Sequence, residues 1–141
     1  MRLQSALACL FIAAAMPAMA DETEVGAAVS VELNAVKSTD SACTLTFLVI
    51  NGFESQIDKL VYEAVLFDAN GQVDRLTLFD FGALPAAIPR VRLFSVPGIA
   101  CEDLGKILIN GANTCEAPEL EPTACEAGLL TDSRTDIEVQ G

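Results

Sequence analysis

The stretch that decides the fold is Cys43-Thr44-Leu45-Thr46-Phe47-Leu48-Val49-Ile50. Its side chains alternate, because the odd positions from Cys43 to Val49 are apolar and share one face, whereas Thr44 and Thr46 lie on the other. Alternation with a period of two is typical of a strand that lies on a hydrophobic core. We therefore expect a central strand here, ending at Asn51-Gly52, because both residues tolerate turn conformations.

Strand patterns continue on both sides of this stretch. They cover residues 29–35 upstream and residues 60–67, 73–81, 90–96, 104–110 and 135–140 downstream. Between two of them, Pro85 and Pro89 remove ladder donors, which predicts a crossover between sheets at 82–89. About seven short strands with turn signals between them, and no convincing helical period, predict an all-β, antiparallel two-sheet β-sandwich.

The first 20 residues have the pattern of a secretory signal peptide. Arg2 supplies a positive start, residues 6–15 are almost wholly apolar, and the segment ends in small residues at Ala20. The acidic residues at 21–24 follow too soon for a membrane-spanning helix, which needs about 20 apolar residues. We expect cleavage after Ala20 and a periplasmic or secreted protein without membrane insertion. A lipid anchor at Cys9 is the alternative, although Ala6-Leu7-Ala8 matches a lipobox poorly.

Cleavage would leave 121 residues, which is the length of one domain. We expect a flexible acidic leader at 21–28 and a single β-sandwich domain at 29–141. The mature chain, residues 21–141, holds 7 Lys and Arg against 20 Asp and Glu, and this net charge of −13 disfavours nucleic acid and anionic lipid as partners. Three kinds of ligand remain compatible with this charge: a protein partner, which could present a basic surface, a cationic peptide, or a divalent metal. The simpler interpretation is that the acidic surface only confers solubility.

Four cysteines remain after cleavage, at positions 43, 101, 115 and 125. An even number in an exported chain predicts two disulfides, and the lack of histidine and of a Cys-x-x-Cys motif disfavours zinc and thioredoxin chemistry. Three pairings exist. We expect Cys43–Cys101, because the turn at Cys101 precedes a strand and can reach the start of the Cys43 strand at one end of a sandwich. Cys115–Cys125 would then staple a long loop at 111–130.

Two acidic segments are candidate metal sites. In the first, Asp68, Asn70 and Asp74 resemble part of a calcium loop, but Gly71 is fourth rather than sixth and Phe79 stands where an EF-hand has glutamate. A hairpin turn explains this segment more simply. The second is the 116–126 loop, which gives the alternative function, binding of calcium or a cationic ligand; a solvated surface is again simpler. Its acidic residues are Glu116, Glu119, Glu121 and Glu126.

No catalytic or cofactor constellation is present. Without histidine, a serine or cysteine nucleophile lacks its usual base, and a small sandwich without tryptophan offers little platform for a sugar. We therefore expect a non-enzymatic protein without a cofactor, either a protein-interaction module or a structural module of the periplasm. We place Phe79 and Phe81 in the core together with Phe67 and Phe94. The alternative is an outward interaction patch of Phe79, Phe81 and Leu84 near a sheet edge.

Several segments together resemble a group of small secreted bacterial proteins, most of them uncharacterised, with an immunoglobulin-like or fibronectin-III-like sandwich. The segments are Cys43 to Asn51, Leu66-Phe67-Asp68 with Gly71, Leu78-Phe79-Asp80-Phe81-Gly82, Arg90-Val91-Arg92 and Cys101. The resemblance spans residues 29 to 140. It implies an immunoglobulin-like sandwich in an exported protein and assigns no site residue.

Overall fold

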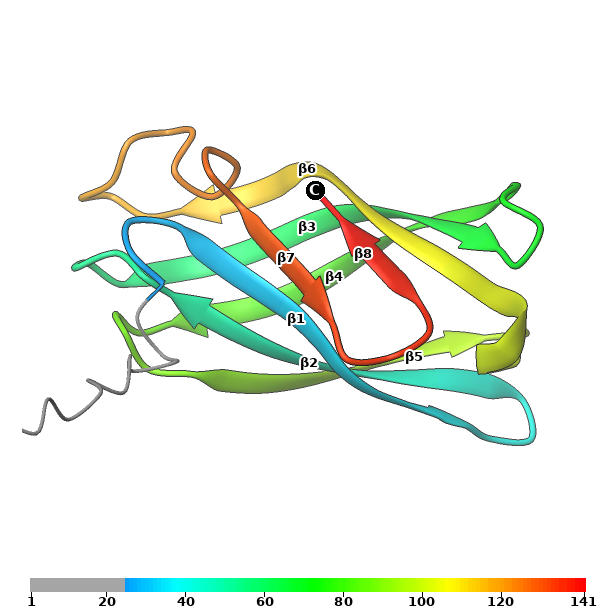
Figure 1. Ribbon diagram of the computed structural model, residues 1–141. Coiled ribbons are helices and arrows are strands. Elements are labelled where there is room, and N and C mark those ends of the chain that lie inside the picture. Colours follow the sequence, from blue (N-terminus) through cyan, green and yellow to red (C-terminus); the bar gives the residue numbers. More distant parts are fainter. Residues whose placement is uncertain (1–24) are drawn as a thin grey trace, which may run out of the picture.

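Two β-sheets packed face to face make up the part of the chain that the computed structural model describes, residues 25–141 (Figure 1). The predicted signal peptide, its expected cleavage after Ala20, the alternative lipid anchor at Cys9 and the first half of the predicted acidic leader lie outside the described residues. The first sheet has the strand order β5-β2-β1-β7 and the second has the order β4-β3-β6-β8. The predicted two-sheet sandwich is therefore confirmed, with eight strands where about seven were expected.

The strands follow one another along the chain, with one short 3-10 helix, η1, before β6. Their bounds are β1 (Val29–Ser38), β2 (Ala42–Asn51), β3 (Ile57–Asp68), β4 (Val73–Leu84), β5 (Arg90–Pro97), η1 (Cys101–Asp103), β6 (Leu104–Glu116), β7 (Leu130–Ser133) and β8 (Glu138–Gln140).

The strand that begins near Cys43 is central, as predicted. β2 pairs with β1 on one side and with β5 on the other, both antiparallel. The alternating residues Cys43, Leu45, Phe47 and Val49 are fully buried, whereas Thr44 and Thr46 are half-buried on the outer face. Period-two alternation has thus placed one face of this strand on the core.

The core lies between β2 of one sheet and β3 and β4 of the other. Leu60, Tyr62, Ala64 and Leu66 of β3 are fully buried on the face toward β2. The ring of Phe47 lies among aromatic rings from both sheets, with centroids 5.5 Å from Phe79, 5.8 Å from Phe81 and 6.0 Å from Phe94. Tilted and edge-to-face rings at these distances attract one another beyond the gain from burial alone.

The loop predicted at 111–130 starts earlier in the sequence than the loop in the structure. β6 runs on to Glu116, pairing with β3 through irregularities near Gly111, whose backbone has a φ of 150°. Glycine adopts such a backbone without cost, so it bends the strand here rather than ending it. The loop is therefore residues 117–129. β4 likewise continues past the predicted end at 81 to Leu84, through Gly82 with a φ of 68°.

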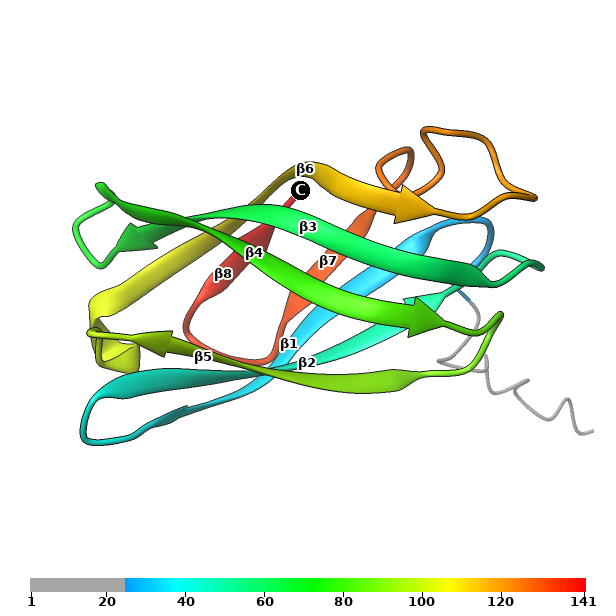
Figure 2. The ribbon, with the colours of Figure 1, turned by 180° about the vertical axis from the view of Figure 1, so that it is seen from behind.

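Only the end of the predicted last strand at 135–140 is a strand, β8, and the short strand before it, β7, was not predicted. β7 pairs parallel with β1, the chain then crosses between the sheets at 134–137, and β8 pairs parallel with β6. Ile137 is buried during this passage, which explains why its alternation with Val139 looked like one strand. The sandwich is therefore mostly, not wholly, antiparallel. It is covered at this edge by β7 and β8, whereas β4 and β5 form the opposite edge (Figures 1 and 2).

Candidate interaction surface

The exposed apolar side chains gather at the β4 and β5 edge. Among residues 25–141 seven large hydrophobic side chains are exposed, and only Leu130 of β7 lies elsewhere. β4 and β5 belong to different sheets, and the crossover that contains Ile88 joins them. We call the exposed part of residues 73–97 the β4–β5 surface. Its large apolar residues are Val73, Leu76, Leu78, Ile88, Val91 and Leu93.

The β4–β5 surface also differs in charge from the rest of the molecule. Residues 73–97 hold three arginines and two aspartates, a net charge of +1. The remaining described residues hold four basic and 15 acidic side chains, a net charge of −11. The sequence-based expectation of a basic partner used the total charge alone. Locally, this most apolar part of the surface has no acidic excess, unlike the described chain as a whole.

Arginine side chains join the two edge strands. Arg92 of β5 donates from Nε to the carbonyl of Phe81 at 2.8 Å and from Nη2 to the carbonyl of Ala83 at 3.2 Å, both on β4. In the other direction, Arg75 of β4 donates to the carbonyl of Pro97 at the end of β5. The sheets are thus linked at this edge by side chains, and no strand of the described chain covers it.

Leucines of β4 extend an apolar row across the outer face of the second sheet. Leu76 is the register partner of Val65 on β3, and Val65 is the partner of Leu108 on β6. Val65 is buried and Leu108 is half-buried, whereas Leu76 at the edge is 62% exposed and Leu78 is 53% exposed. The row therefore ends at Leu76, with Leu78 on the same face of β4 opposite Glu63 of β3, and no strand lies on the outer side of either leucine.

The alternative interaction patch of Phe79, Phe81 and Leu84 is wrong. All three side chains are buried, with exposed fractions of 2%, 0% and 0%, and the core placement of Phe79 and Phe81 is confirmed. β4 does lie at an edge, but its large aromatic residues face the core, where they remove the most surface from water. Sequence reasoning missed the outward residues Leu76 and Leu78. The signal that could have found them is the alternation of this strand, which places leucines opposite the phenylalanines.

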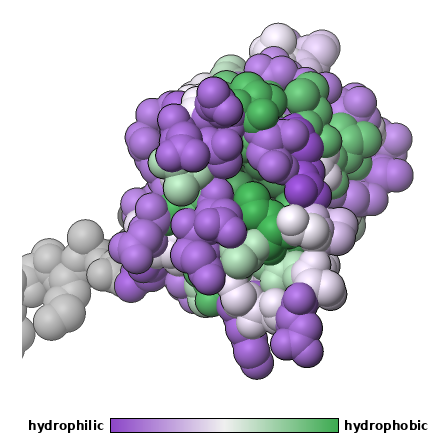
Figure 3. Space-filling model, turned by 90° about the vertical axis from the view of Figure 1, so that its right-hand side faces the viewer, coloured by the Kyte–Doolittle hydropathy of each residue, from purple (hydrophilic) through white to green (hydrophobic). Residues whose placement is uncertain are grey.

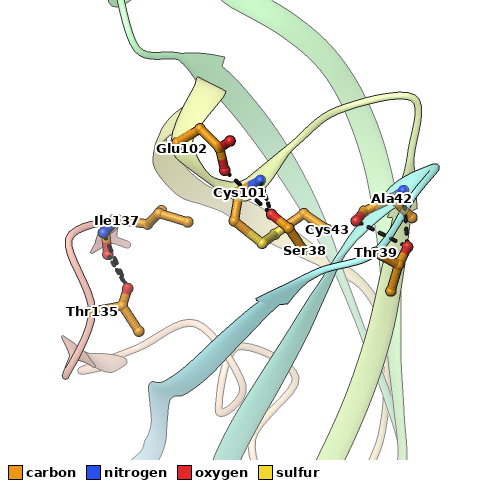
Figure 4. Close-up of a disulfide and its surroundings, with 8 residues drawn as sticks. All are labelled: Ser38, Thr39, Ala42, Cys43, Cys101, Glu102, Thr135 and Ile137. Atoms are coloured by element: carbon orange, nitrogen blue, oxygen red, sulfur yellow. Dashed lines mark hydrogen bonds between the residues drawn. A yellow bond between two sulfur atoms is a disulfide. The ribbon is translucent and has the colours of Figure 1, made fainter.

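The first predicted disulfide is present between Cys43 and Cys101, with Cα atoms 4.9 Å apart. It links β2 of the first sheet to η1, which leads directly into β6 of the second sheet. Polar contacts hold the same region: the Cys101 N–H donates to Ser38 Oγ at 2.9 Å, and this hydroxyl donates to Glu102 Oε2 at 3.3 Å (Figure 4). The bond therefore ties together the two layers at one end of the sandwich, as the sequence argument predicted.

The second predicted disulfide joins Cys115, near the end of β6, to Cys125 in the loop. The same loop is anchored in the core by Tyr62, whose hydroxyl donates to the carbonyl of Cys125 at 2.5 Å. Burial, and secondarily the charge of Glu126, raises the pKa of Tyr62 well above its usual range. The phenol therefore stays neutral and remains a donor.

Residues 68–74, for which a calcium loop was the alternative to the expected hairpin turn, make a hairpin turn. Asp68 Oδ1 accepts hydrogen bonds from the N–H groups of Asn70 at 2.9 Å and Gln72 at 3.0 Å, which stabilises the turn between β3 and β4. Gly71 has a φ of 83°, as such turns require. Asp74 forms an ion pair with Arg75. The hairpin interpretation accounts for all these contacts.

The acidic loop uses its carboxylates individually. Glu126 accepts the N–H of Ala112 at 2.7 Å, and Glu119 accepts the hydroxyl of Ser55 at 3.0 Å, so the two hold the loop to β6 and to the β2–β3 connection. Glu116 and Glu121 are exposed. Among residues 25–141 no three His, Cys, Asp or Glu side chains stand close enough together to hold a metal ion. The structure thus gives this loop hydrogen-bonding roles.

A groove of about 860 Å³ lies beside the Cys43–Cys101 bond, between β1, η1 and the passage from β7 to β8. Glu102, Arg134 and Asp136 contribute polar groups to it, and Leu104 and Ile137 contribute apolar ones. Seen from this end, the molecule is mostly hydrophilic with separate hydrophobic patches (Figure 3). The groove brings together no set of groups that would act as nucleophile, base and anion-stabilising donors.

Within the described residues no helix is long and apolar enough to cross a membrane.

No protein-family model matches the sequence, and a search of curated proteins finds no match. A solved structure of IrmA from Escherichia coli is similar in fold, with a TM-score of 0.55 and 14% sequence identity. The similarity covers 76% of this chain and 91% of the IrmA chain. At this identity the likeness concerns the fold alone.

Proposed function

We propose that this chain is an exported, non-enzymatic β-sandwich that acts by binding another protein, in the periplasm or outside the cell. The observation that carries the proposal is the β4–β5 surface, where six of the seven exposed large hydrophobic side chains of residues 25–141 gather. Leu76 and Leu78 lie on the outer face of the second sheet and Val91 and Leu93 on the outer face of the first, so exposed apolar side chains flank this edge on both sides. Exposed apolar side chains concentrated along one edge are typical of a protein contact site. The remaining acidic surface keeps the protein soluble.

Export is supported by the cysteines and by the N-terminal sequence. Two disulfides tie this small domain, and such bonds persist mainly in oxidising compartments. The charged, apolar and small-residue regions of residues 1–20 form the pattern that signal peptidase recognises. A role without catalysis is supported by the absence of histidine from the whole sequence, which removes the commonest general base.

An immunoglobulin-like architecture is part of the same proposal. The order β4-β3-β6-β8 corresponds to the C′-C-F-G order of that fold, and β1, β2 and β5 correspond to strands A, B and E. The chain departs from this pattern in two places, because β7 is added parallel to β1 and β8 runs parallel to β6 where the immunoglobulin sheet is antiparallel. Domains of this architecture commonly serve recognition between proteins, which agrees with the proposed binding role, although fold alone does not decide function.

Cross-linking in the periplasm tests the proposed function. The full chain, tagged at its C-terminus, would be cross-linked in its native host and isolated under denaturing conditions. We expect one or a few cross-linked proteins that are absent when an unrelated acidic β-sandwich of the same size is exported instead. The same set of proteins with both baits, or no cross-linked product, would contradict a specific binding role.

A further inference from the structure

Resting on the proposed function, we infer that β4 is the binding element and that its partner is an extended protein segment with alternating acidic and apolar side chains. The segment adds a strand beside β4 and so widens the second sheet. Strand addition of this kind uses main-chain hydrogen bonds for affinity and alternate side chains for specificity. Three features of β4 carry the inference: its free edge, its outward leucines and the arginines beside it.

The first feature is the unpaired edge of β4. This strand has 12 residues, pairs with β3 only, and is at the end of its sheet. Arg92 covers the carbonyls of Phe81 and Ala83, which protects the C-terminal part of the strand. Among the described residues no side chain bonds to the main chain of residues 75–80. That part offers the unpaired donors and acceptors on which another strand can form.

The other edges are less suited to an added strand. β5 has eight residues, and arginines already bond to its carbonyls at Val91 and Pro97. β7 and β8 have only four and three residues, and the chain passes between them from one sheet to the other. Short or covered edges are the usual protection against unwanted pairing, so β4 is the edge left open.

The second feature is the apolar row at the outer face of β4. An added strand would place alternate side chains beside Leu76 and Leu78, continuing the row from Leu108 through Val65. Cross-strand apolar pairs at such positions stabilise a sheet. The side chains of the partner strand on this face should therefore be apolar and, in keeping with strand propensity, β-branched.

The third feature is the positive charge of the arginines that would face the inner side of the added strand. The remaining partner side chains would point toward the space between β4 and β5, where Arg75 and Arg92 reach across. Arg90 and Arg92 bond only to main-chain carbonyls, so among the described residues their charges have no carboxylate partner. A glutamate or aspartate at these partner positions would supply one. Lysine or arginine there would be repelled, which gives the site its specificity.

A designed peptide tests the inference without knowledge of the natural partner. The probe is an acetylated peptide of about seven residues that alternates valine with glutamate, a length that matches a usual strand. The control probe has lysine in place of each glutamate. Binding to the folded protein would be followed by NMR chemical shifts at low salt. We expect shifts centred on residues 75–80, and at least tenfold weaker binding of the lysine peptide.

Two variants separate the β4 edge from general stickiness. Leu76→Lys with Leu78→Lys should weaken binding of the glutamate peptide at least tenfold, because lysines at an edge oppose an added strand. The matched control is Leu130→Lys, which changes an exposed leucine on β7 and should leave binding unchanged. Both variants are checked for a native NMR spectrum first. If either fails this check, Leu78→Lys alone replaces the pair and Leu130→Thr replaces the control.

Four outcomes would overturn the inference. They are no binding of either peptide, equal binding of both peptides, shifts that map away from β4, and self-association of the protein that blocks β4, in which case a second copy is the occupant. Repeating the periplasmic cross-linking with the Leu76→Lys and Leu78→Lys variant separates the two proposals. Unchanged cross-linked partners would keep the binding function and reject β4, whereas loss of those partners supports both.

Discussion

The two disulfides stabilise the molecule in different ways. Cys43–Cys101 spans 58 positions of sequence and joins the two sheets through η1, whereas Cys115–Cys125 spans 10 positions and joins a loop to the strand that precedes it. Cys43 lies in the middle of the core cluster, while Cys115 is only half-buried at its border. One bond therefore acts on the whole sandwich and the other on one end of β6.

This difference shows how a small domain distributes its cross-links. Two small layers bury only a limited hydrophobic core, so burial alone stabilises them little. A bond between the layers adds stability because it closes a long loop and so restricts the unfolded chain. The loop at 117–129 contains few apolar anchors, and a short bond with one tyrosine holds it in place. We expect global stability to depend mainly on the first bond and local order on the second.

The largest effect should come from removing the bond between the layers. Replacing Cys43 and Cys101 with alanine should lower the free energy of unfolding by about 4 kcal/mol, the chain-entropy value for a loop of this length. Denaturant unfolding of the variant and of the wild type, both oxidised, measures it. A loss smaller than that from the other bond would reverse the comparison.

The second bond should matter less. Replacing Cys115 and Cys125 with alanine should cost about 3 kcal/mol by the same relation for its shorter loop, with Cys125 leaving a small void in addition. Hydrogen exchange should show the loss of protection concentrated at residues 111–129, and the β2 amides least affected. Uniform loss of protection across both sheets would show that this bond, too, supports the whole domain.

A third, smaller effect isolates the tyrosine that anchors the same loop. Tyr62→Phe keeps the buried ring but removes its hydrogen bond to the carbonyl of Cys125, at a cost of about 1–2 kcal/mol. Thermal unfolding of the variant measures this loss. Phe53→Leu changes a half-buried position outside the loop and controls for the general sensitivity of the core. In this variant the amide exchange of residues near Cys125 should equal that of the wild type.

The pH dependence of stability tests the same contact. The pKa of Tyr62 is raised in the folded protein, mainly by burial, while in the unfolded chain it has its ordinary value near 10. The folded state therefore binds this proton more tightly, so the contribution is complete below about pH 10 and is lost as the pH rises above it. Wild type should lose stability in this range more steeply than Tyr62→Phe. Equal slopes would show that the hydroxyl ionises as freely in the folded state as in the unfolded one.

The smallest effect concerns calcium. A site filled at 100 times its Kd would add about 2.7 kcal/mol to the free energy of unfolding. Because the loop carboxylates bond to separate protein groups, we expect no gain when millimolar Ca²⁺ is added or chelator is applied. A clear rise in melting temperature with Ca²⁺, lost in Glu119→Gln, would instead assign the loop a metal-binding role.

Much of the fold could be predicted where a local pattern and the tertiary environment agree. The alternation from Cys43 to Val49 determines which face of β2 is buried, and the position of Cys101 before a strand was enough to pair it with Cys43. Prolines 85 and 89 correctly indicated the crossover between sheets, because neither can complete a ladder.

The remaining features depend on contacts that no local pattern records. Gly111 looks like a strand end, yet β3 continues to pair beyond it, so the strand bends instead. The alternating run at 135–140 was predicted as one strand, yet only Glu138–Gln140 pairs, because residues 134–137 carry the chain from β7 in the first sheet to β8 in the second. For the interaction surface, the alternative to core placement was that Phe79 and Phe81 face outward near a sheet edge. The exposed residues are leucines of the opposite face, and only the arrangement of both sheets shows which face of an edge strand meets water.

The parallel pairing of β7 with β1 has a consequence for how the chain acquires its structure. Ser30 pairs with Leu130, so one of the earliest segments cannot complete its ladder until residues a hundred positions later are present. Contacts at such separation slow folding, because the intervening chain must first be ordered. The polypeptide should therefore mature after synthesis rather than during it. An immature molecule would spend this delay with an incomplete first sheet, the period in which holdase chaperones protect chains from aggregation.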